Sequence, residues 1–126
     1  MVLEHCKSMA DGSYRPVDLL RVSITEQCNE NCLYCRQDSS LLTESNRTPL
    51  ELSEVFRIVQ ALSELGFNKV RLTGGEPLIR KGVVDLVRQI TNLPAVESLG
   101  MTTNATLLAS YASQLKAAGL KSINIS

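Results

Sequence analysis

Apolar residues along this chain fall into short runs separated by longer stretches with helical spacing. Four short runs predict strands at residues 19–24, 69–72, 96–102 and 121–126. Between them, apolar side chains recur every three or four residues in segments that begin near residues 48, 83 and 108, as in amphipathic helices. Because strands and helices alternate, we predict an α/β protein with a parallel sheet and right-handed crossovers.

The limits of the predicted helices follow from residues that favour helix ends. In the sequence TPLE, Thr48 is the expected N-cap, Pro49 the first helical residue, and Glu51 the partner that closes a capping box. Gly66 and Gly119 are placed to end the first and third helices. Residues 1–18 are predicted to be a polar lead-in, and residues 19–126 the α/β core.

The last predicted strand is apolar and would leave an unpaired edge and an uncovered face. Four such strand units are half of an eightfold barrel. The sheet could therefore curve into an incomplete (β/α) barrel, and the end of the chain looks like a truncation rather than a natural domain end. A small open α/β sheet is the simpler alternative.

Charge and hydropathy narrow the range of partners. Thirteen basic residues balance thirteen acidic ones, which argues against a broad nucleic-acid-binding surface. No apolar run approaches the ~20 residues that span a membrane, and the N-terminus is unlike a secretory signal. We expect a cytoplasmic protein with no nucleic-acid or membrane partner, in which cysteines stay reduced. Two glycosylation sequons, NRT and NAT, are then chance matches.

Three cysteines lie in the sequence CNENCLYC, in the long loop after the first predicted strand: Cys28, Cys32 and Cys35. Three thiolates can hold three irons of a [4Fe–4S] cluster and leave the fourth iron open to a small molecule. A zinc site completed by His5 or Cys6 fits the spacing equally well. Loop thiols without any metal are a further alternative.

The other predicted strands also end in polar or glycine-rich sequence. TGGEP follows the second strand, TTN follows the third, and Ser126 ends the fourth. Adjacent glycines allow a ligand to approach main-chain groups, although a tight turn is the alternative explanation. Parallel α/β folds place their chemistry at the carboxyl ends of strands, so these loops are predicted to form one cleft.

CNENCLYC together with RLTGGEP resembles the radical S-adenosylmethionine (SAM) superfamily. In that superfamily SAM chelates the open iron, and an electron from the reduced cluster breaks the sulfonium bond to release a 5′-deoxyadenosyl radical. The blocks LLRVSITEQCNENCLYC, KVRLTGGEPLIRKG, MTTNATLL and LKAAGLKSINIS are similar, in the same order, to the GTP cyclases of molybdenum cofactor biosynthesis. The resemblance implies a complete or partial (β/α) barrel with the cluster at its mouth.

The resemblance also implies roles for individual residues. The implied [4Fe–4S] ligands are Cys28, Cys32 and Cys35, the implied SAM contacts are Tyr34, Gly74, Gly75, Glu76 and Ser126, and the implied GTP contacts are Arg21, Arg71 and Thr102. Guanidinium groups suit a triphosphate or a purine edge, but each arginine could instead form a structural ion pair. Thr103 could serve in place of Thr102. We expect valine at Gly75 to block SAM and leave the cluster in place.

The activity implied is that of a lyase that converts GTP into a cyclised pterin precursor, using an external electron donor. A homodimer of the full-length protein is an open alternative to a monomer. This chain alone is expected to be inactive or nearly so, because it lacks the family's second half and second cluster. Another radical SAM activity, such as peptide or haem modification, and a noncatalytic metal-binding fragment also remain open. Ala105, where the family usually has glycine, departs from the pattern.

Overall fold

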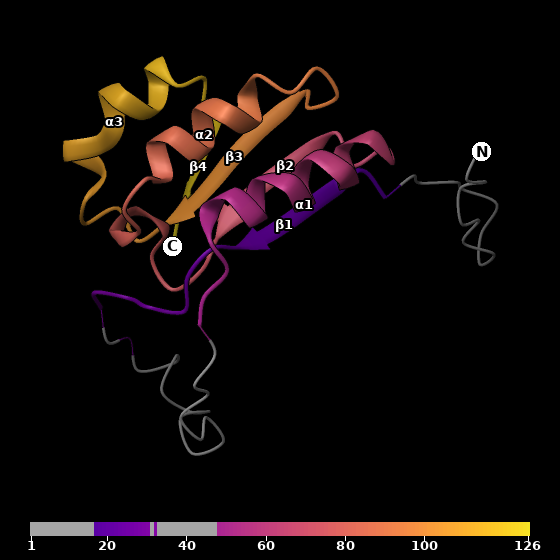
Figure 1. Cartoon of the computed structure of the whole chain (residues 1–126). Helices are drawn as coiled ribbons and strands as arrows, with labels where there is room; N and C mark the ends of the chain where they lie inside the picture. The colour runs from indigo at the N-terminus through magenta and orange to yellow at the C-terminus, as the bar shows by residue number, and fades with distance from the viewer. Residues whose placement is uncertain (1–16, 31, 33–47) are drawn as a thin grey trace, which may run out of the picture.

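The computed structural model describes residues 17–30, 32 and 48–126 of the chain (Figure 1). His5, Cys6, Tyr34 and Cys35 lie outside the described residues. The described elements, in chain order, are β1 (Leu19–Ser23), α1 (Leu52–Glu64), β2 (Lys69–Thr73), the 3-10 helix η2 (Pro77–Ile79), α2 (Val83–Thr91), β3 (Ser98–Thr103), α3 (Leu108–Ala117) and β4 (Ser122–Ile125).

The four strands form one open sheet in the order β1-β2-β3-β4, with every neighbouring pair parallel. Figure 1 shows α1, α2 and α3 lying along the same face of this sheet. The parallel α/β fold predicted from the alternation of apolar patterns is therefore confirmed, and the sheet is open as expected of an incomplete barrel. In the described part of the chain, no helix is long and apolar enough to cross a membrane.

The hydrophobic core lies between the three helices and the sheet face that they cover. Alternate residues of β2, Val70 and Leu72, are buried in this core. The predicted apolar stripe of α2 is confirmed, because its four members are buried: Val83, Leu86, Val87 and Ile90. Each such side chain contributes about 1.5–3 kcal/mol on burial. The residues between them along the strands face the other side of the sheet.

The first helix begins later than the sequence predicted. Helix α1 starts at Leu52 with Glu51 as its N-cap, not with Thr48 in that position. The Glu51 N–H donates to a carboxylate oxygen of Glu54 at 2.8 Å. The acid that closes the capping box is therefore Glu54, three residues after the predicted Glu51. The carbonyl of Leu50 accepts a hydrogen bond from the Arg80 side chain, which holds this segment outside the helix.

An exposed contact joins the beginnings of β1 and β2, at the amino edge of the sheet. The Lys69 N–H donates to the Asp18 carbonyl at 3.0 Å, and the two side chains form an ion pair at 2.5 Å. Hydrogen bonding to the Lys69 ammonium lowers the pKa of Asp18, and the same bond raises the pKa of Lys69. The pair adds little stability at so exposed a site, but it marks where β1 enters the sheet.

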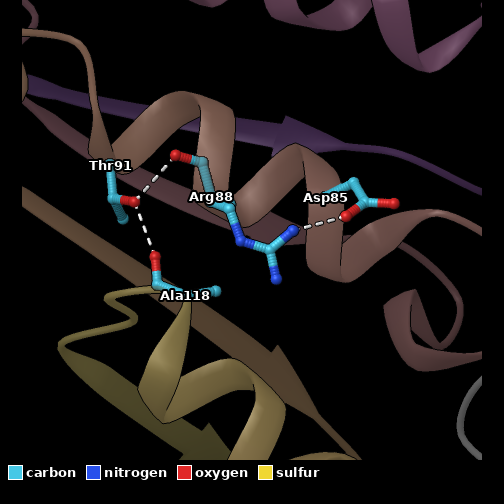
Figure 2. Close-up of polar contacts among 4 residues, drawn as sticks. All are labelled: Asp85, Arg88, Thr91 and Ala118. Carbon is cyan, nitrogen blue, oxygen red and sulfur yellow. Dashed lines mark hydrogen bonds and ion pairs between the residues drawn. The ribbon is translucent and has the colours of Figure 1, made fainter.

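Helices α2 and α3 are joined by a hydroxyl at the end of α2 (Figure 2). The hydroxyl of Thr91 lies 2.6 Å from the Ala118 carbonyl oxygen and 3.0 Å from the Arg88 carbonyl oxygen. The next residue, Gly119, has φ +96°, and a Cβ there would meet the Thr91 side chain at 3.1 Å. Gly119 therefore ends α3, as predicted, at a point of close approach to α2. The ion pair between Asp85 and Arg88 is more than half exposed and stabilises α2 only slightly.

One residue of the loop after β3 has a backbone conformation that disfavours its side chain. Ala105 has φ +66°, in the left-handed region, and its N–H donates to the Thr103 hydroxyl at 3.1 Å. This conformation explains why glycine is usual at this position in the family that the sequence resembles. The Cβ of Ala105 costs the loop conformational energy that glycine would not.

We predict that Ala105→Gly stabilises the protein by about 0.5–1 kcal/mol, since relief of the left-handed strain exceeds the added backbone entropy. Urea unfolding measures the difference. Ala112→Gly, at an exposed site inside α3, is the matched control and should destabilise by about 0.5–1 kcal/mol. Equal losses in the two variants would contradict the assigned conformation.

Candidate functional site

The parallel strands bring the loops singled out in the sequence to one edge of the sheet. The start of the cysteine loop follows β1, the GGEP turn follows β2, and a loop that begins at Asn104 follows β3. Ser126 follows β4, and its N–H donates to the Thr103 carbonyl at 3.1 Å. The predicted convergence at the carboxyl edge is thus found for the described residues of all four loops.

The cysteine loop runs directly beside the glycine turn, held by main-chain hydrogen bonds. The Gly75 N–H donates to the Thr25 carbonyl at 2.8 Å, and the Glu76 N–H donates to the Gln27 carbonyl at 2.8 Å. These bonds continue the pairing of β1 with β2 beyond the strands. The position of Cys28, the next residue, is therefore set by the glycine turn.

The two glycines are needed because the loop backbone lies so close. A Cβ on Gly75 would lie 2.1 Å from the Gln27 carbonyl oxygen, and a Cβ on Gly74 would lie 2.5 Å from the Thr25 carbonyl oxygen. Both distances are far below van der Waals contact. The close approach expected at this pair is real, but the partner is the protein's own cysteine loop, so the N–H of Gly75 is already bonded. Among the described residues, no main-chain N–H donates to either glycine carbonyl, so these carbonyls are open to a ligand.

Glu76 is fully buried, with 0% of its surface exposed. One carboxylate oxygen accepts from the Leu78 N–H at 3.0 Å and from the Thr103 hydroxyl at 2.7 Å, and the other accepts from the Asn104 N–H at 2.7 Å. Its side chain therefore joins the tip of β2 to the tip of β3. The SAM contact that the resemblance implied for Glu76 stays a prediction, and this geometry does not place its carboxylate at the surface.

Arg80 holds the two ends of the cysteine loop together. Its guanidinium donates to the Ile24 carbonyl, just before the loop, and to the Leu50 carbonyl, just before α1. One planar, permanently charged group thus bonds two carbonyls that are 26 residues apart in sequence (50 − 24). The role of Arg80 could not be predicted from the sequence, because only the folded loop brings its two acceptors together.

The two described cysteines are free thiols: Cys28 is exposed and Cys32 is partly exposed. The Glu30 N–H lies 3.5 Å from the Cys28 sulfur, and the Cys32 thiol lies 3.9 Å from a Glu30 carboxylate oxygen. Within residues 17–30, 32 and 48–126, no three metal-ligating side chains gather. Cys35, the third predicted ligand, lies outside those residues. Two accessible thiols beside a backbone-anchored turn fit an iron–sulfur cluster at this edge.

The three predicted GTP contacts share the sheet face that the helices leave uncovered. Arg21 pairs with Arg71 across β1 and β2, and Arg71 pairs with Gly100 across β2 and β3. Thr102 lies two residues beyond Gly100 and hence on the same face. The structure therefore brings these three residues onto one polar surface next to the cysteine edge.

The electrostatics of this surface favour an anion. Arg21 and Arg71 are like charges on directly paired positions, which destabilises a sheet unless a counter-charge is near. Neither forms an ion pair with another described residue. One guanidinium nitrogen of Arg71 is buried and has no hydrogen-bond partner among the described residues. An anionic ligand would supply the missing acceptor.

Side-chain hydrogen bonds join the cysteine loop to the loop after β3. Asn29 in the cysteine loop contacts Asn104 and Thr106 in the loop after β3. Asn104 belongs to the sequence TTN at a strand tip, which marked it as a candidate site residue. Its partner Asn29, however, is 75 residues away in sequence. Only the pairing of β1 with β2 and of β2 with β3 brings these side chains together.

Comparison with known proteins agrees with the geometry. A family model described as the Radical SAM superfamily matches residues 22–126. A curated protein named GTP 3′,8-cyclase from Petrotoga mobilis is 46% identical over 118 residues, and proteins of that name from Alkaliphilus metalliredigens and Peptoclostridium acidaminophilum are 44% and 43% identical. These matches cover 94% of this chain and 36–37% of each relative, so the chain spans about a third of their length.

Solved structures of BtrN have a similar fold. BtrN in complex with AdoMet and 2-DOIA has a TM-score of 0.68 at 22% identity, and selenomethionine BtrN in an open conformation has a TM-score of 0.66 at 21%. Both cover 88% of this chain and about half of the BtrN chain (46% and 50%). At this level of identity the likeness concerns the fold alone.

We predict that Gly75→Ala lowers stability by about 1–3 kcal/mol, because the new methyl group meets the Gln27 carbonyl and the cysteine loop must shift. Urea unfolding measures the loss. The structure thereby revises the expectation for valine at this position: displacement of Gln27 should disturb Cys28, so iron uptake should fall as well as SAM binding.

Gly66→Ala is the matched control for this prediction. Gly66 also has a positive φ, +105°, but a Cβ there would meet nothing within 4 Å. It should cost about 1 kcal/mol from backbone strain and leave iron uptake unchanged. Wild-type stability and iron content in Gly75→Ala would show that the loop does not pack on the turn as described.

Proposed function

The chain belongs to the radical SAM superfamily, and from this premise we propose that it forms the SAM- and cluster-binding part of a GTP 3′,8-cyclase in molybdenum cofactor biosynthesis. The observation that carries the proposal is the identity along nearly the whole chain with proteins of that name. The paired arginines beside the cysteine edge support it, because they offer a site for a triphosphate.

We assign the cluster to the edge where β1 ends. Cys28, Cys32 and Cys35 would hold a [4Fe–4S] cluster, with one iron free of protein ligands. When bound, this cluster supplies the electron that cleaves SAM. The role of the chain is to hold the thiolates at a fixed position, and the hydrogen bonds of Gly75 and Glu76 to the loop backbone serve that purpose.

We assign SAM to the carboxyl edge of β2 and β4. The carbonyls of Gly74 and Gly75 are acceptors suited to the amino group of SAM, since the Gly75 N–H is bonded within the protein. Ser126, exposed at the tip of β4, offers a hydroxyl to the same ligand. Tyr34 would shield or contact SAM from the cysteine loop.

We assign GTP to the uncovered face of the sheet. The guanidinium groups of Arg21 and Arg71 would bind its phosphates or its base, and Thr102 would donate a hydrogen bond from the next strand. This face adjoins the cysteine edge, so a substrate there would lie next to SAM. Hydrogen abstraction from the ribose followed by attack of the ribose carbon on the base would then give the cyclised pterin precursor.

The proposal includes the remaining expectations from the sequence. An external reductant would supply the cluster electron, and the full-length protein would work in the cytoplasm, with a homodimer as one form of its assembly. The core would extend over residues 19–126, after a lead-in of 1–18. Because the relatives are about three times as long, the complete reaction would need residues beyond those that this chain contains.

We predict that the chain, reconstituted with iron and sulfide without oxygen, binds about four irons and cleaves SAM to 5′-deoxyadenosine when dithionite reduces it. Iron analysis and chromatography of the SAM products measure both results. Cys32→Ala should abolish cluster assembly, because two thiolates cannot hold the cluster. Uptake of zinc with no iron would contradict the enzymatic assignment.

In a full-length version of the protein, we predict that Arg71→Ala weakens GTP binding at least tenfold, because a charged hydrogen bond worth about 1.5–3 kcal/mol is lost. SAM cleavage without GTP turnover should persist. Calorimetric titration with GTP measures the affinity. Arg88→Ala, which removes the same charge from an exposed position on α2, is the control, and equal affinities in the two variants would contradict the role given to Arg71.

A further inference from the structure

Three side chains from two loops form a closed ring of hydrogen bonds beside Cys28. The Asn104 amide donates to the Asn29 side-chain oxygen at 2.9 Å, and the Asn29 amide donates to the Thr106 hydroxyl at 2.8 Å. The Thr106 hydroxyl in turn donates to the Asn104 side-chain oxygen at 2.8 Å. Each member is both donor and acceptor, an arrangement in which every bond strengthens the next.

Asn104 is the member of this ring that the fold fixes most firmly. Its backbone N–H is bonded to the buried carboxylate of Glu76 at 2.7 Å, directly after β3. The Thr106 N–H also donates to the Asn104 side-chain oxygen, at 3.1 Å. Asn29, by contrast, is exposed in the cysteine loop. The ring therefore joins an exposed residue of the cysteine loop to a residue that the fold holds through Glu76.

The side-chain amide of Asn104 also faces a predicted cluster ligand. Its nitrogen lies 3.9 Å from the Cys28 sulfur, within reach of an N–H···S contact. Hydrogen bonds to the sulfurs of an iron–sulfur cluster are one of the means by which a protein sets the cluster's reduction potential. A donor favours the more negatively charged, reduced form, so it raises the potential.

We propose that Asn104 is a positioning residue for the cluster: it holds Asn29 and Cys28 in place and donates to the Cys28 sulfur, which makes the cluster easier to reduce. This inference rests on the proposed function in one respect, since it takes Cys28 as a ligand. The anchoring of the loop depends only on contacts within the chain and can be tested without any metal.

The first test measures the loop in the metal-free chain by 15N relaxation. In Asn104→Ala, the order parameters of the Asn29 and Glu30 backbone amides should fall from about 0.85 to below about 0.6. Asn104→Asp keeps the acceptor for Thr106 but loses the amide donor, and should have the same effect. Asn92→Ala, at the C-cap of α2, is the control and should change neither value.

The second test measures the reconstituted cluster by a redox titration followed by electron paramagnetic resonance. At the wild-type midpoint potential, Asn104→Ala should hold roughly threefold less reduced cluster than wild type, as expected from one lost hydrogen bond. Asn92→Ala should match wild type. If Asn104→Ala takes up no iron while Asn92→Ala takes up as much as wild type, the result would also support a role of Asn104 in positioning the cluster ligands.

Two results would overturn the proposal. One is an iron-loaded Asn104→Ala with an unchanged midpoint potential, which removes the donor role. The other is unchanged order parameters at Asn29 and Glu30, which removes the anchoring role. If wild-type protein takes up no iron, the proposed function fails, while the relaxation measurement still decides whether Asn104 anchors the loop.

Discussion

The arrangement of the site depends on two main-chain hydrogen bonds between the cysteine loop and the glycine turn. They join Gly75 to Thr25 and Glu76 to Gln27, and they form only because the two glycines lack a Cβ. A parallel ladder that would otherwise stop with the strands thus continues into the loop. The consequence is that Cys28 starts from a fixed backbone position, although the residue itself is exposed.

The buried carboxylate of Glu76 extends this constraint from β2 to β3. Its three donors are the Leu78 N–H in η2, the hydroxyl of Thr103 at the end of β3, and the N–H of Asn104 directly after β3, so hydrogen bonds join the two strand tips. Asn104 carries the constraint back to the cysteine loop through its side chain. Three separate loops are therefore held against one another by hydrogen bonds, while the hydrophobic core lies beneath them on the helical face.

Much of the fold could be predicted from the sequence, because apolar spacing and helix-ending residues act locally. The stripe of α2 and the glycine after α3 are examples. The start of α1 was predicted wrongly because the Glu51 N–H, which the predicted capping box would give to Thr48, donates to Glu54, and because Arg80 bonds the Leu50 carbonyl. The convergence of the site loops was also predictable, since parallel strands end at one edge.

The contacts within the site were not predictable, because they depend on pairings across the sheet. The spacing of residues along the sequence predicts neither the hydrogen bonds of Arg80 to both ends of the cysteine loop nor the ring of hydrogen bonds around Asn104. The glycine pair was expected to serve a ligand, whereas the Gly75 N–H and the missing side chains of both glycines serve the cysteine loop. The ligand contacts assigned to the site residues stay predictions, and Cys35 and Tyr34 also lie outside the described residues.

The most direct test of this account is the through-bond scalar coupling across the two loop–turn hydrogen bonds, measured in metal-free, 15N,13C-labelled chain. We predict measurable coupling between the Gly75 nitrogen and the Thr25 carbonyl carbon, and between the Glu76 nitrogen and the Gln27 carbonyl carbon. Absence of both couplings, with fast solvent exchange of the two amides, would contradict the account. The loop would then owe its position to a bound metal and not to the glycine turn.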